Sequence, residues 1–211
     1  MTNNAFDDEQ PLRDEIAIAA ARLVAQDGAD YSTAKRKAAR QILGQSNQHV
    51  GLPDNAQIEN EVRLYNALFL GDTQPARLRR LREIALDIME ELEQFHPYLT
   101  GAVLNGTAGP HAEIHLKLFA DSAKSVEIFL LNKNIQIDLS ETPHFRGPRH
   151  DNVETVSFLW HDEGVHAALY DLDDLRGALK PKADGKIMRL DSVGLRALLA
   201  LPETGAEEEQ P

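Results

Sequence analysis

Residues 98–119 read YLTGAVLNGTAGPHAEIHLKLF, and the spacing of apolar side chains changes within this stretch. Upstream of it, apolar residues recur every three or four positions, which is typical of one face of a helix. From Ile114 onwards they alternate with polar residues, as on a strand with one buried face. We therefore predict a short strand over 99–104 and a second strand over 112–119. Three polar residues would share one face of the second strand: Glu113, His115 and Lys117.

Four helices are predicted before this stretch, because each apolar series is bounded by residues that start or stop helices. Asp54 and Gln57 have the spacing of a capping box. In a capping box the side chain of each residue accepts a hydrogen bond from the backbone N–H of the other at the first turn of a helix. Pro97 ends the last series, since proline cannot continue a helix. The predicted helices cover residues 12–27, 32–43, 54–69 and 75–95.

Strands dominate the prediction after residue 119. Residues 125–131 are apolar on both faces, as a central strand would be, and 135–139 could add another short strand. Two longer alternating segments, 153–160 and 165–170, are joined at residues 161–164 and predict a hairpin. Two further helices are predicted over residues 172–179 and 192–201.

The predicted fold class is therefore α/β (α+β), with an N-terminal helical half packed on a mixed β-sheet. The polar, acidic start and the acidic end of the chain are expected to be disordered. The expected divisions are a disordered lead (1–10), a helical module (11–72), an α/β core (73–201) and a disordered acidic tail (202–211).

Composition excludes several classes of protein. The chain of 211 residues has no cysteine, so disulfides, thiol nucleophiles, thiolate zinc sites and iron–sulfur clusters are absent. Neither a signal peptide nor an apolar run of about 20 residues is present, which favours a cytoplasmic protein with no membrane partner. The net charge of −12 disfavours non-specific binding to nucleic acid, because it repels the phosphate backbone.

The stretch 98–131 resembles the nucleotidyltransferases of the DNA polymerase β superfamily. These proteins carry a strand ending in G-S, then R-G-x-A, then S-D-[IV]-D-[LI] on the next strand, with a third carboxylate on a neighbouring strand. In this chain Gly101-Ala102 corresponds to G-S, Asn105 to Ala108 to R-G-x-A, and Ala112 to Leu116 to S-D-I-D-L. Glu127, within V-E-I, takes the position of the third acid.

The resemblance implies a mixed sheet of nucleotidyltransferase type and a site that holds two divalent ions with a nucleotide. It implies metal-binding and catalytic roles for Glu113, His115 and Glu127. It implies nucleotide binding by a second set of residues: Gly101, Ala102, Asn105, Gly106 and Thr107. Mg²⁺ or Mn²⁺ would be the cofactor.

The ligands nevertheless depart from the family pattern. Glutamate replaces the first aspartate at Glu113, histidine replaces the second at His115, and the serine is Ala102. Imidazole is a nitrogen ligand, which Mg²⁺ disfavours relative to oxygen. We therefore expect a nucleotidyltransferase-like protein, a pseudoenzyme with lost or altered catalysis, that binds a nucleotide, another small molecule or a protein partner.

Two alternatives remain open at the level of sequence. The first is an active metal-dependent nucleotidyltransferase that transfers a nucleoside monophosphate to an unknown acceptor. The second is a non-catalytic interaction scaffold, in which the face carrying Glu113, His115 and Lys117 is only the solvated side of a strand. The sequence leaves the choice between enzyme and binding protein undecided.

Overall fold

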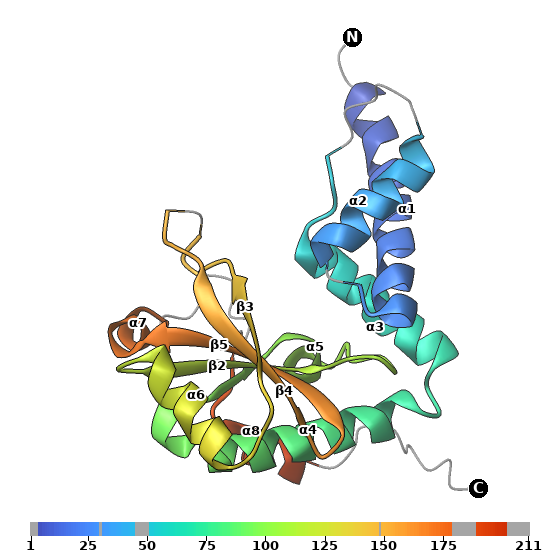
Figure 1. Cartoon of the computed structure of the whole chain (residues 1–211). Helices are drawn as coiled ribbons and strands as arrows, with labels where there is room; N and C mark the ends of the chain where they lie inside the picture. The colour runs from blue at the N-terminus through green and yellow to red at the C-terminus, as the bar shows by residue number, and fades with distance from the viewer. Residues whose placement is uncertain (1–3, 30, 45–50, 148, 179–188, 202–211) are drawn as a thin grey trace, which may run out of the picture. The chain divides into compact units, whose positions relative to one another are not determined.

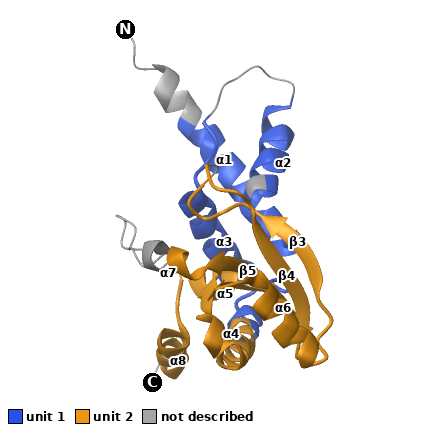
Figure 2. Ribbon diagram, turned by 60° about the vertical axis from the view of Figure 1, so that its left-hand side comes forward, with its two compact units in different colours: residues 1–77, 106–112 blue, residues 78–105, 113–211 orange. Residues whose placement is uncertain are grey.

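The computed structural model describes residues 4–29, 31–44, 51–147, 149–178 and 189–201. The chain forms two compact units, which Figure 2 distinguishes by colour. The first unit comprises residues 1–77 and 106–112, and the second comprises residues 78–105 and 113–211. None of the described helices is both long and apolar enough to cross a membrane.

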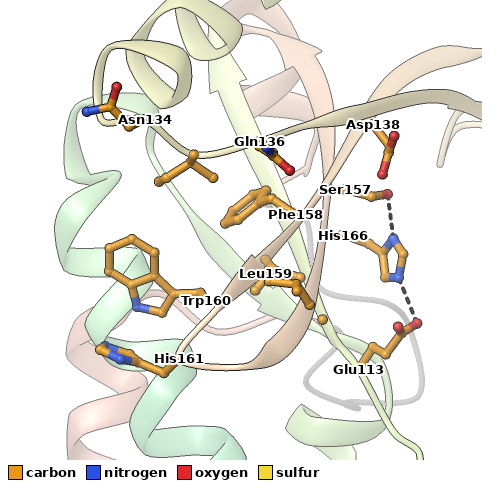
Figure 3. Close-up of a pocket in the computed structure, with 13 residues that line it drawn as sticks. Glu113, Asn134, Gln136, Asp138, Ser157, Phe158, Leu159, Trp160, His161 and His166 are labelled. Atoms are coloured by element: carbon orange, nitrogen blue, oxygen red, sulfur yellow. Dashed lines mark hydrogen bonds and ion pairs between the residues drawn. The ribbon is translucent and has the colours of Figure 1, made fainter.

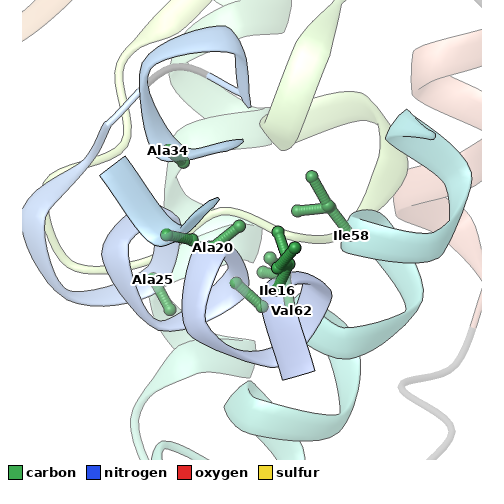
Figure 4. Packing of buried hydrophobic residues seen from close by; sticks show 8 residues of the cluster. Ile16, Ala20, Ala25, Ala34, Ile58 and Val62 are labelled. Atoms are coloured by element: carbon green, nitrogen blue, oxygen red, sulfur yellow. The ribbon is translucent and has the colours of Figure 1, made fainter. Parts of the chain in front are cut away.

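The first unit is helical. It contains α1 (Asn4–Asp27), α2 (Tyr31–Leu43), α3 (Asn55–Phe69) and the loop 106–112. Its core is rich in alanine, whose small side chain allows helices to pack closely (Figure 4). The buried core residues come from all three helices: Ile16, Ala20, Ala21, Ala25, Ala34, Ala38, Ile58 and Val62.

The loop 106–112 is tied to this helical unit by side-chain amides. Nε2 of Gln74 donates to the carbonyl oxygens of Gly106 and Ala108, at 3.1 and 3.0 Å. Nδ2 of Asn66, which is buried on α3, donates to the carbonyl oxygen of Thr107 at 3.3 Å. The backbone of this loop is therefore fixed by hydrogen bonds to the unit that α1, α2 and α3 build.

The second unit contains a five-stranded mixed sheet with helices (Figure 1). Its helices are the greater part of α4 (Gln74–Glu91), the 3₁₀ turn Glu93–Phe95, α5 (Gly101–Asn105), α6 (Ala123–Asn132), α7 (Leu172–Ala178) and α8 (Ser192–Ala200). Its strands are β1 (Tyr98–Thr100), β2 (Ile114–Ala120), β3 (Asp138–Thr142), β4 (Val153–Trp160) and β5 (Glu163–Asp171).

The strand order is β1-β2-β5-β4-β3. β2 and β5 are parallel, and the other neighbouring pairs are antiparallel. The register places His115 of β2 beside His166 of β5, and His166 beside Ser157 of β4. Three polar side chains from three strands therefore lie in one row across the middle of the sheet, on the same face.

The two faces of this sheet differ in chemistry. One face packs into the core of the unit through buried side chains: Ile114, Leu116, Leu118, Val156, Phe158, Val165, Ala167 and Leu169. The opposite face, which we call the polar face, carries Thr100, His115, Lys117, Thr155, Ser157 and His166. One end of the polar face is an apolar cluster, where Phe119 and Tyr170 pack with Phe145 and with Leu172 and Leu175 of α7.

The α/β fold class is confirmed: among the described residues, four α-helices (α1 to α4) precede β1, and a mixed five-stranded sheet begins there. The predicted hairpin is also present, and β4 and β5 turn at His161 and Asp162. The predicted strand over 125–131 is wrong, because these residues lie in α6. Val126 and Leu130 of α6 are buried at helical spacing, while Ile128 remains 55% exposed.

Smaller differences concern boundaries. The strand predicted over 99–104 ends at Thr100 and is followed by α5, and the one predicted over 135–139 begins at Asp138. α1 begins at Asn4, so residues 4–10 are helical rather than a disordered lead. The second unit begins at Leu78 rather than at residue 73, and 106–112 belong to the helical unit. The tail predicted over 202–211 lies outside the described residues.

Candidate functional site

A hydrogen-bonded chain of three side chains occupies the polar face (Figure 3). Oε2 of Glu113 lies 2.7 Å from Nε2 of His166, and Nδ1 of the same ring lies 2.7 Å from Oγ of Ser157. Glu113 directly precedes β2, His166 lies on β5 and Ser157 on β4. The three residues are brought together by strand register, since each comes from a different part of the chain.

The partners of His166 fix the hydrogen positions in its neutral form. An ionised carboxylate has no proton to donate, so Nε2 carries the hydrogen and donates to Glu113. The other ring nitrogen, Nδ1, then has only a lone pair and accepts from the hydroxyl of Ser157. Ser157 therefore points its proton at a base whose opposite side is held by a carboxylate.

His115 completes this row. Its ring stacks on that of His166, with ring centres 5.1 Å apart and planes inclined by 22°. The side chain of His115 is accessible to solvent, yet enough protein atoms lie around it to desolvate the ring. This burial lowers the pKa of His115, and the nearby His166 lowers it further, while Glu113 acts in the opposite direction. His115 is therefore favoured as a neutral hydrogen-bonding group.

The turn at Gly101 lies against His115. Gly101 begins α5 directly after β1, with a φ of +72° that side chains other than glycine rarely adopt. A Cβ at Gly101 would lie 3.5 Å from Cβ of His115, which is an ordinary contact. Backbone conformation, rather than lack of space, is thus the reason for glycine at this position.

Two hollows on the second unit meet at His166. The larger, which we call the Trp160 pocket, has a volume of about 610 Å³ and includes Glu113, Asp138, Ser157, Phe158 and Trp160 (Figure 3). The smaller, which we call the Lys117 pocket, has a volume of about 230 Å³. The Lys117 pocket is lined mainly by polar side chains: Thr100, His115, Lys117, Ser140, Thr142, Thr155 and His166.

Lys117 is positioned by aromatic rings at the apolar end of the polar face. Its Nζ lies 4.8 Å from the ring centre of Phe145 and 5.8 Å from that of Tyr170. A cation over an aromatic face is attracted by the negative side of the ring. These rings hold the ammonium group at the wall of the Lys117 pocket, two residues along β2 from His115.

Of the residues expected to form the site, Glu113, His115 and Gly101 are close together, and Glu127 is apart from them. Glu127 lies on α6 and is 7% exposed, with Oε2 lying 3.4 Å from Nζ of Lys124. It faces Glu154 of β4, which shares the core side of the sheet with Val156. The pKa of Glu154 is raised mainly by burial and to a smaller extent by a hydrogen bond with Glu127. Glu127 is therefore part of a carboxyl pair on the opposite side of the sheet.

The residues expected to bind nucleotide are divided between the two units. Gly101, Ala102 and Asn105 lie in α5 of the second unit. Gly106 and Thr107 lie in the loop of the helical unit, where Gln74 and Asn66 hold their carbonyl groups. The five positions thus do not form one continuous loop within a single unit.

The side chains present do not fit a pair of magnesium ions. Glu113 is the one carboxylate among these four side chains, and its Oε2 is bonded to His166. His115 and His166 are imidazoles and Ser157 is a hydroxyl. Magnesium prefers oxygen ligands in an octahedral arrangement. Among the residues that the structure describes, no group of three or more histidine and acidic side chains is placed to hold a metal ion.

Ser157 and His166 were missed as site residues at the level of sequence. Neither belongs to a motif, and nine positions separate them. The signal that could have found them is the hairpin: a two-residue turn at His161-Asp162 pairs Trp160 with Glu163, and three pairs further on it places Ser157 opposite His166. Glu113 then joins them through the parallel pairing of β2 with β5.

Comparison of the chain with models of known protein families and with curated proteins gave no match.

Proposed function

We propose that this is a nucleotidyltransferase-like protein with lost or altered catalysis, which binds the phosphate groups of a nucleotide in the Lys117 pocket. The observation that carries the proposal is the composition of this pocket. An ammonium group, two imidazoles and four hydroxyls gather beside the Gly101 turn. Lys117 and the imidazole of His115 are suited to an anionic ligand, and the resemblance of residues 98–131 suggests that the anion is a nucleotide.

Charge supports a phosphate in this pocket rather than in its neighbour. Lys117 supplies a positive charge, and His115 is an imidazole that can hydrogen-bond to phosphate oxygens. The Trp160 pocket instead carries the carboxylates of Glu113 and Asp138, which disfavour the more highly charged terminal phosphates there. The two pockets share His166, so one elongated ligand could occupy both.

The composition of the row also supports altered catalysis. In the family that the sequence resembles, the third carboxylate lies on a strand neighbouring the one with the first two. In this chain β5 is the parallel neighbour of β2, and the residue paired with His115 is His166. An imidazole in this place reduces the negative charge that two divalent ions would require.

Thermal unfolding in the presence of nucleotides tests the proposal. The four ribonucleoside triphosphates and inorganic tripolyphosphate are each added to the full chain, with and without Mg²⁺ or Mn²⁺. A ligand at 100 times its dissociation constant stabilises the state that binds it by about 2.7 kcal/mol, so the unfolding midpoint should rise. Lys117→Ala should abolish most of this rise.

Lys133→Ala is the matched control, because Lys133 lies at the end of α6 in an exposed ion pair with Glu91. Removing this pair should leave nucleotide binding unchanged. The proposal fails if neither nucleotides nor tripolyphosphate change the midpoint. Binding that requires Mn²⁺ and is lost in Glu113→Ala would favour an active metal-dependent nucleotidyltransferase instead, since manganese accepts imidazole more readily than magnesium does.

A further inference from the structure

We infer that Ser157 is a nucleophile, activated by His166 and Glu113, which becomes covalently nucleotidylated. This inference rests on the proposed function for the identity of the substrate, but the activation of Ser157 rests on geometry alone. Both ring nitrogens of His166 are occupied, Nε2 by Glu113 and Nδ1 by Ser157. The proton that His166 can remove in this arrangement is therefore that of the Ser157 hydroxyl.

The surroundings of the three residues are built for this contact. Gly164 lies beside Glu113, and a Cβ at that position would stand 2.6 Å from Oε1 of Glu113 and 3.1 Å from its Cγ. A side chain at position 164 would therefore require the carboxylate of Glu113 to move. His115 packs against the face of the His166 ring and limits its rotation. The orientation of the base is thus held by the carboxylate at one edge and by the stacked ring on one face.

Ser157 is also accessible to a ligand. Its side chain lines the Trp160 pocket, and Thr155, two residues away on the same face of β4, lines the Lys117 pocket. Two residues along a strand span about 7 Å, so Ser157 lies where the two pockets adjoin. A nucleoside triphosphate with its β- and γ-phosphates at Lys117 would bring its α-phosphorus towards Ser157.

The Trp160 pocket is suited to the nucleoside. Trp160, which is only partly buried, offers aromatic surface for a base, while the amides of Asn134 and Gln136 can hydrogen-bond to its edge or to the sugar. Nε1 of Trp160 donates to Oδ2 of Asp87 on α4 at 2.7 Å, which fixes the orientation of the indole ring. This subsite therefore offers a ring-binding surface that is already oriented.

The step itself is a substitution at phosphorus. Oγ of Ser157 attacks the α-phosphorus as its proton passes to Nδ1 of His166. The bond from oxygen to the α-phosphorus forms, and the bond from the α-phosphorus to the bridging oxygen breaks. Pyrophosphate leaves with the bonding electrons, and the carboxylate of Glu113 stabilises the imidazolium. The product is a nucleoside monophosphate ester of Ser157.

Acyl transfer is less well supported by the same geometry. A serine acyltransferase needs hydrogen-bond donors aimed at a carbonyl oxygen, which backbone amides commonly supply. Ser157 instead lies within a central strand, paired with Asp138 on one side and His166 on the other. The cationic and hydroxyl groups nearby are those of the Lys117 pocket, which suit phosphate.

The first arm of the test needs no nucleotide. The full chain is treated with a fluorophosphonate, which reacts with activated serines, and the labelled peptide is identified by mass spectrometry. We expect labelling at Ser157, none at this position in Ser157→Ala, and a rate about 100-fold lower in His166→Asn, as for loss of a general base. Ser125→Ala is the control, because the Ser125 hydroxyl donates to the backbone carbonyl of Ser122, the N-cap residue of α6, which does not act as a base.

The second arm uses each ribonucleoside triphosphate as its magnesium complex, followed by measurement of the intact mass. A gain of one nucleoside monophosphate, mapped to Ser157 and absent from His166→Asn, supports the inference. Absence of any gain overturns it, even where thermal unfolding shows that the nucleotide binds and the proposed function stands. A gain of phosphate alone, or hydrolysis of p-nitrophenyl esters that depends on Ser157, overturns the assignment to nucleotidyl transfer.

The fluorophosphonate arm separates the two failures. If Ser157 is no more reactive than Ser125, the claim that it is a nucleophile is overturned in the wild-type chain, whatever the variants do. If Ser157 reacts but neither nucleotides nor tripolyphosphate bind, the proposed function fails while the activated serine remains.

Discussion

Gly164 and Glu113 lie so close together that a single methyl group could not be placed between them: a Cβ on Gly164 would stand 2.6 Å from Oε1 of Glu113. Gly164 is the second residue of β5, and Glu113 directly precedes β2, its parallel neighbour. This close approach positions the carboxylate against His166, two residues further along β5. It makes Gly164 a positioning residue for the hydrogen-bonded chain of Glu113, His166 and Ser157.

We predict that Gly164→Ala separates Glu113 from His166. The reaction of Ser157 with a fluorophosphonate should slow to the rate of Glu113→Ala. The free energy of unfolding should change by less than the roughly 1–3 kcal/mol typical of overpacked cores, because a half-exposed side chain can move aside. Gly51→Ala is the control, since a Cβ at Gly51 would meet no atom within 4 Å. An unchanged rate in Gly164→Ala would contradict the positioning role.

The pH dependence of His115 provides a second prediction. Burial and His166 lower its pKa in the folded state, so the proton midpoint of His115 in an NMR titration should lie below about 6.5, the value of an unperturbed histidine. Since Glu113 raises this pKa, Glu113→Gln should move the midpoint lower still. A midpoint that rises in Glu113→Gln would contradict this account of the site.

The same shift makes stability depend on pH. A histidine whose pKa is lowered by folding binds its proton more readily in the unfolded chain, so the unfolded state is favoured as the pH falls below about 6.5. We expect His115→Asn to lose less stability between pH 7 and pH 5 than the wild type does. Denaturant unfolding followed by the fluorescence of Trp160, the only tryptophan in the chain, measures this in the second unit.

A third prediction concerns the start of α3. Oδ1 of Asp54 accepts from the backbone N–H of Gln57 at 2.8 Å, and Oε1 of Gln57 accepts from that of Asp54 at 3.0 Å. Asp54→Ala should cost the helical unit about 1 kcal/mol, whereas Asp54→Asn should cost only a few tenths because asparagine caps equally well. Hydrogen exchange at the first turn of α3 would show the difference. Equal protection in both variants would refute the capping role.

Acid should weaken this cap as well. The hydrogen bond with the Gln57 backbone lowers the pKa of Asp54 below its usual value of 3.8. A carboxylate whose pKa is lowered by folding stabilises the folded state above the unfolded pKa, and this contribution is lost as the pH falls through the folded pKa. Protection of the first turn of α3 should therefore decline below about pH 4 in the wild type and much less in Asp54→Asn.

The core side of the sheet provides a fourth prediction. Leu118 of β2 is fully buried, so Leu118→Ala should reduce the free energy of unfolding by about 2–5 kcal/mol through lost burial and the resulting cavity. Leu139→Ala is the control, because this side chain is 53% exposed and should change stability by no more than about 0.5 kcal/mol. Urea unfolding followed by Trp160 fluorescence compares the two, and similar losses would be inconsistent with the packing described.

The sequence was most informative where side-chain periodicity was regular. The capping box at Asp54, the series of α4 and the alternation of β2 and β4 correspond to the observed elements, because each pattern is long and has clear boundaries. The segment around Glu127 was misassigned as a strand because a short apolar run has no distinguishing period. The helical conformation of this segment is stabilised by packing of Val126 and Leu130 against the sheet.

The site was only partly predictable for a related reason. Glu113 and His115 are neighbours in sequence, so strand alternation was enough to place them on one face. Ser157 and His166 depend on which strands are adjacent and in what register, and a single strand pattern contains neither. The resemblance of the sequence indicated an acid on a neighbouring strand, yet the residue of β5 beside His115 is His166.

The parallel pairing of β2 with β5 also means that the sheet can form only late in synthesis. Glu113 and His166 are 53 positions apart, so β2 leaves the ribosome long before the strand that covers its second edge. Until then β2 has unpaired backbone groups beside an apolar face, which is a common starting point for aggregation. A nascent chain that stalls before residue 163 would thus depend on chaperones, and refolding of the second unit should be limited by this distant pairing.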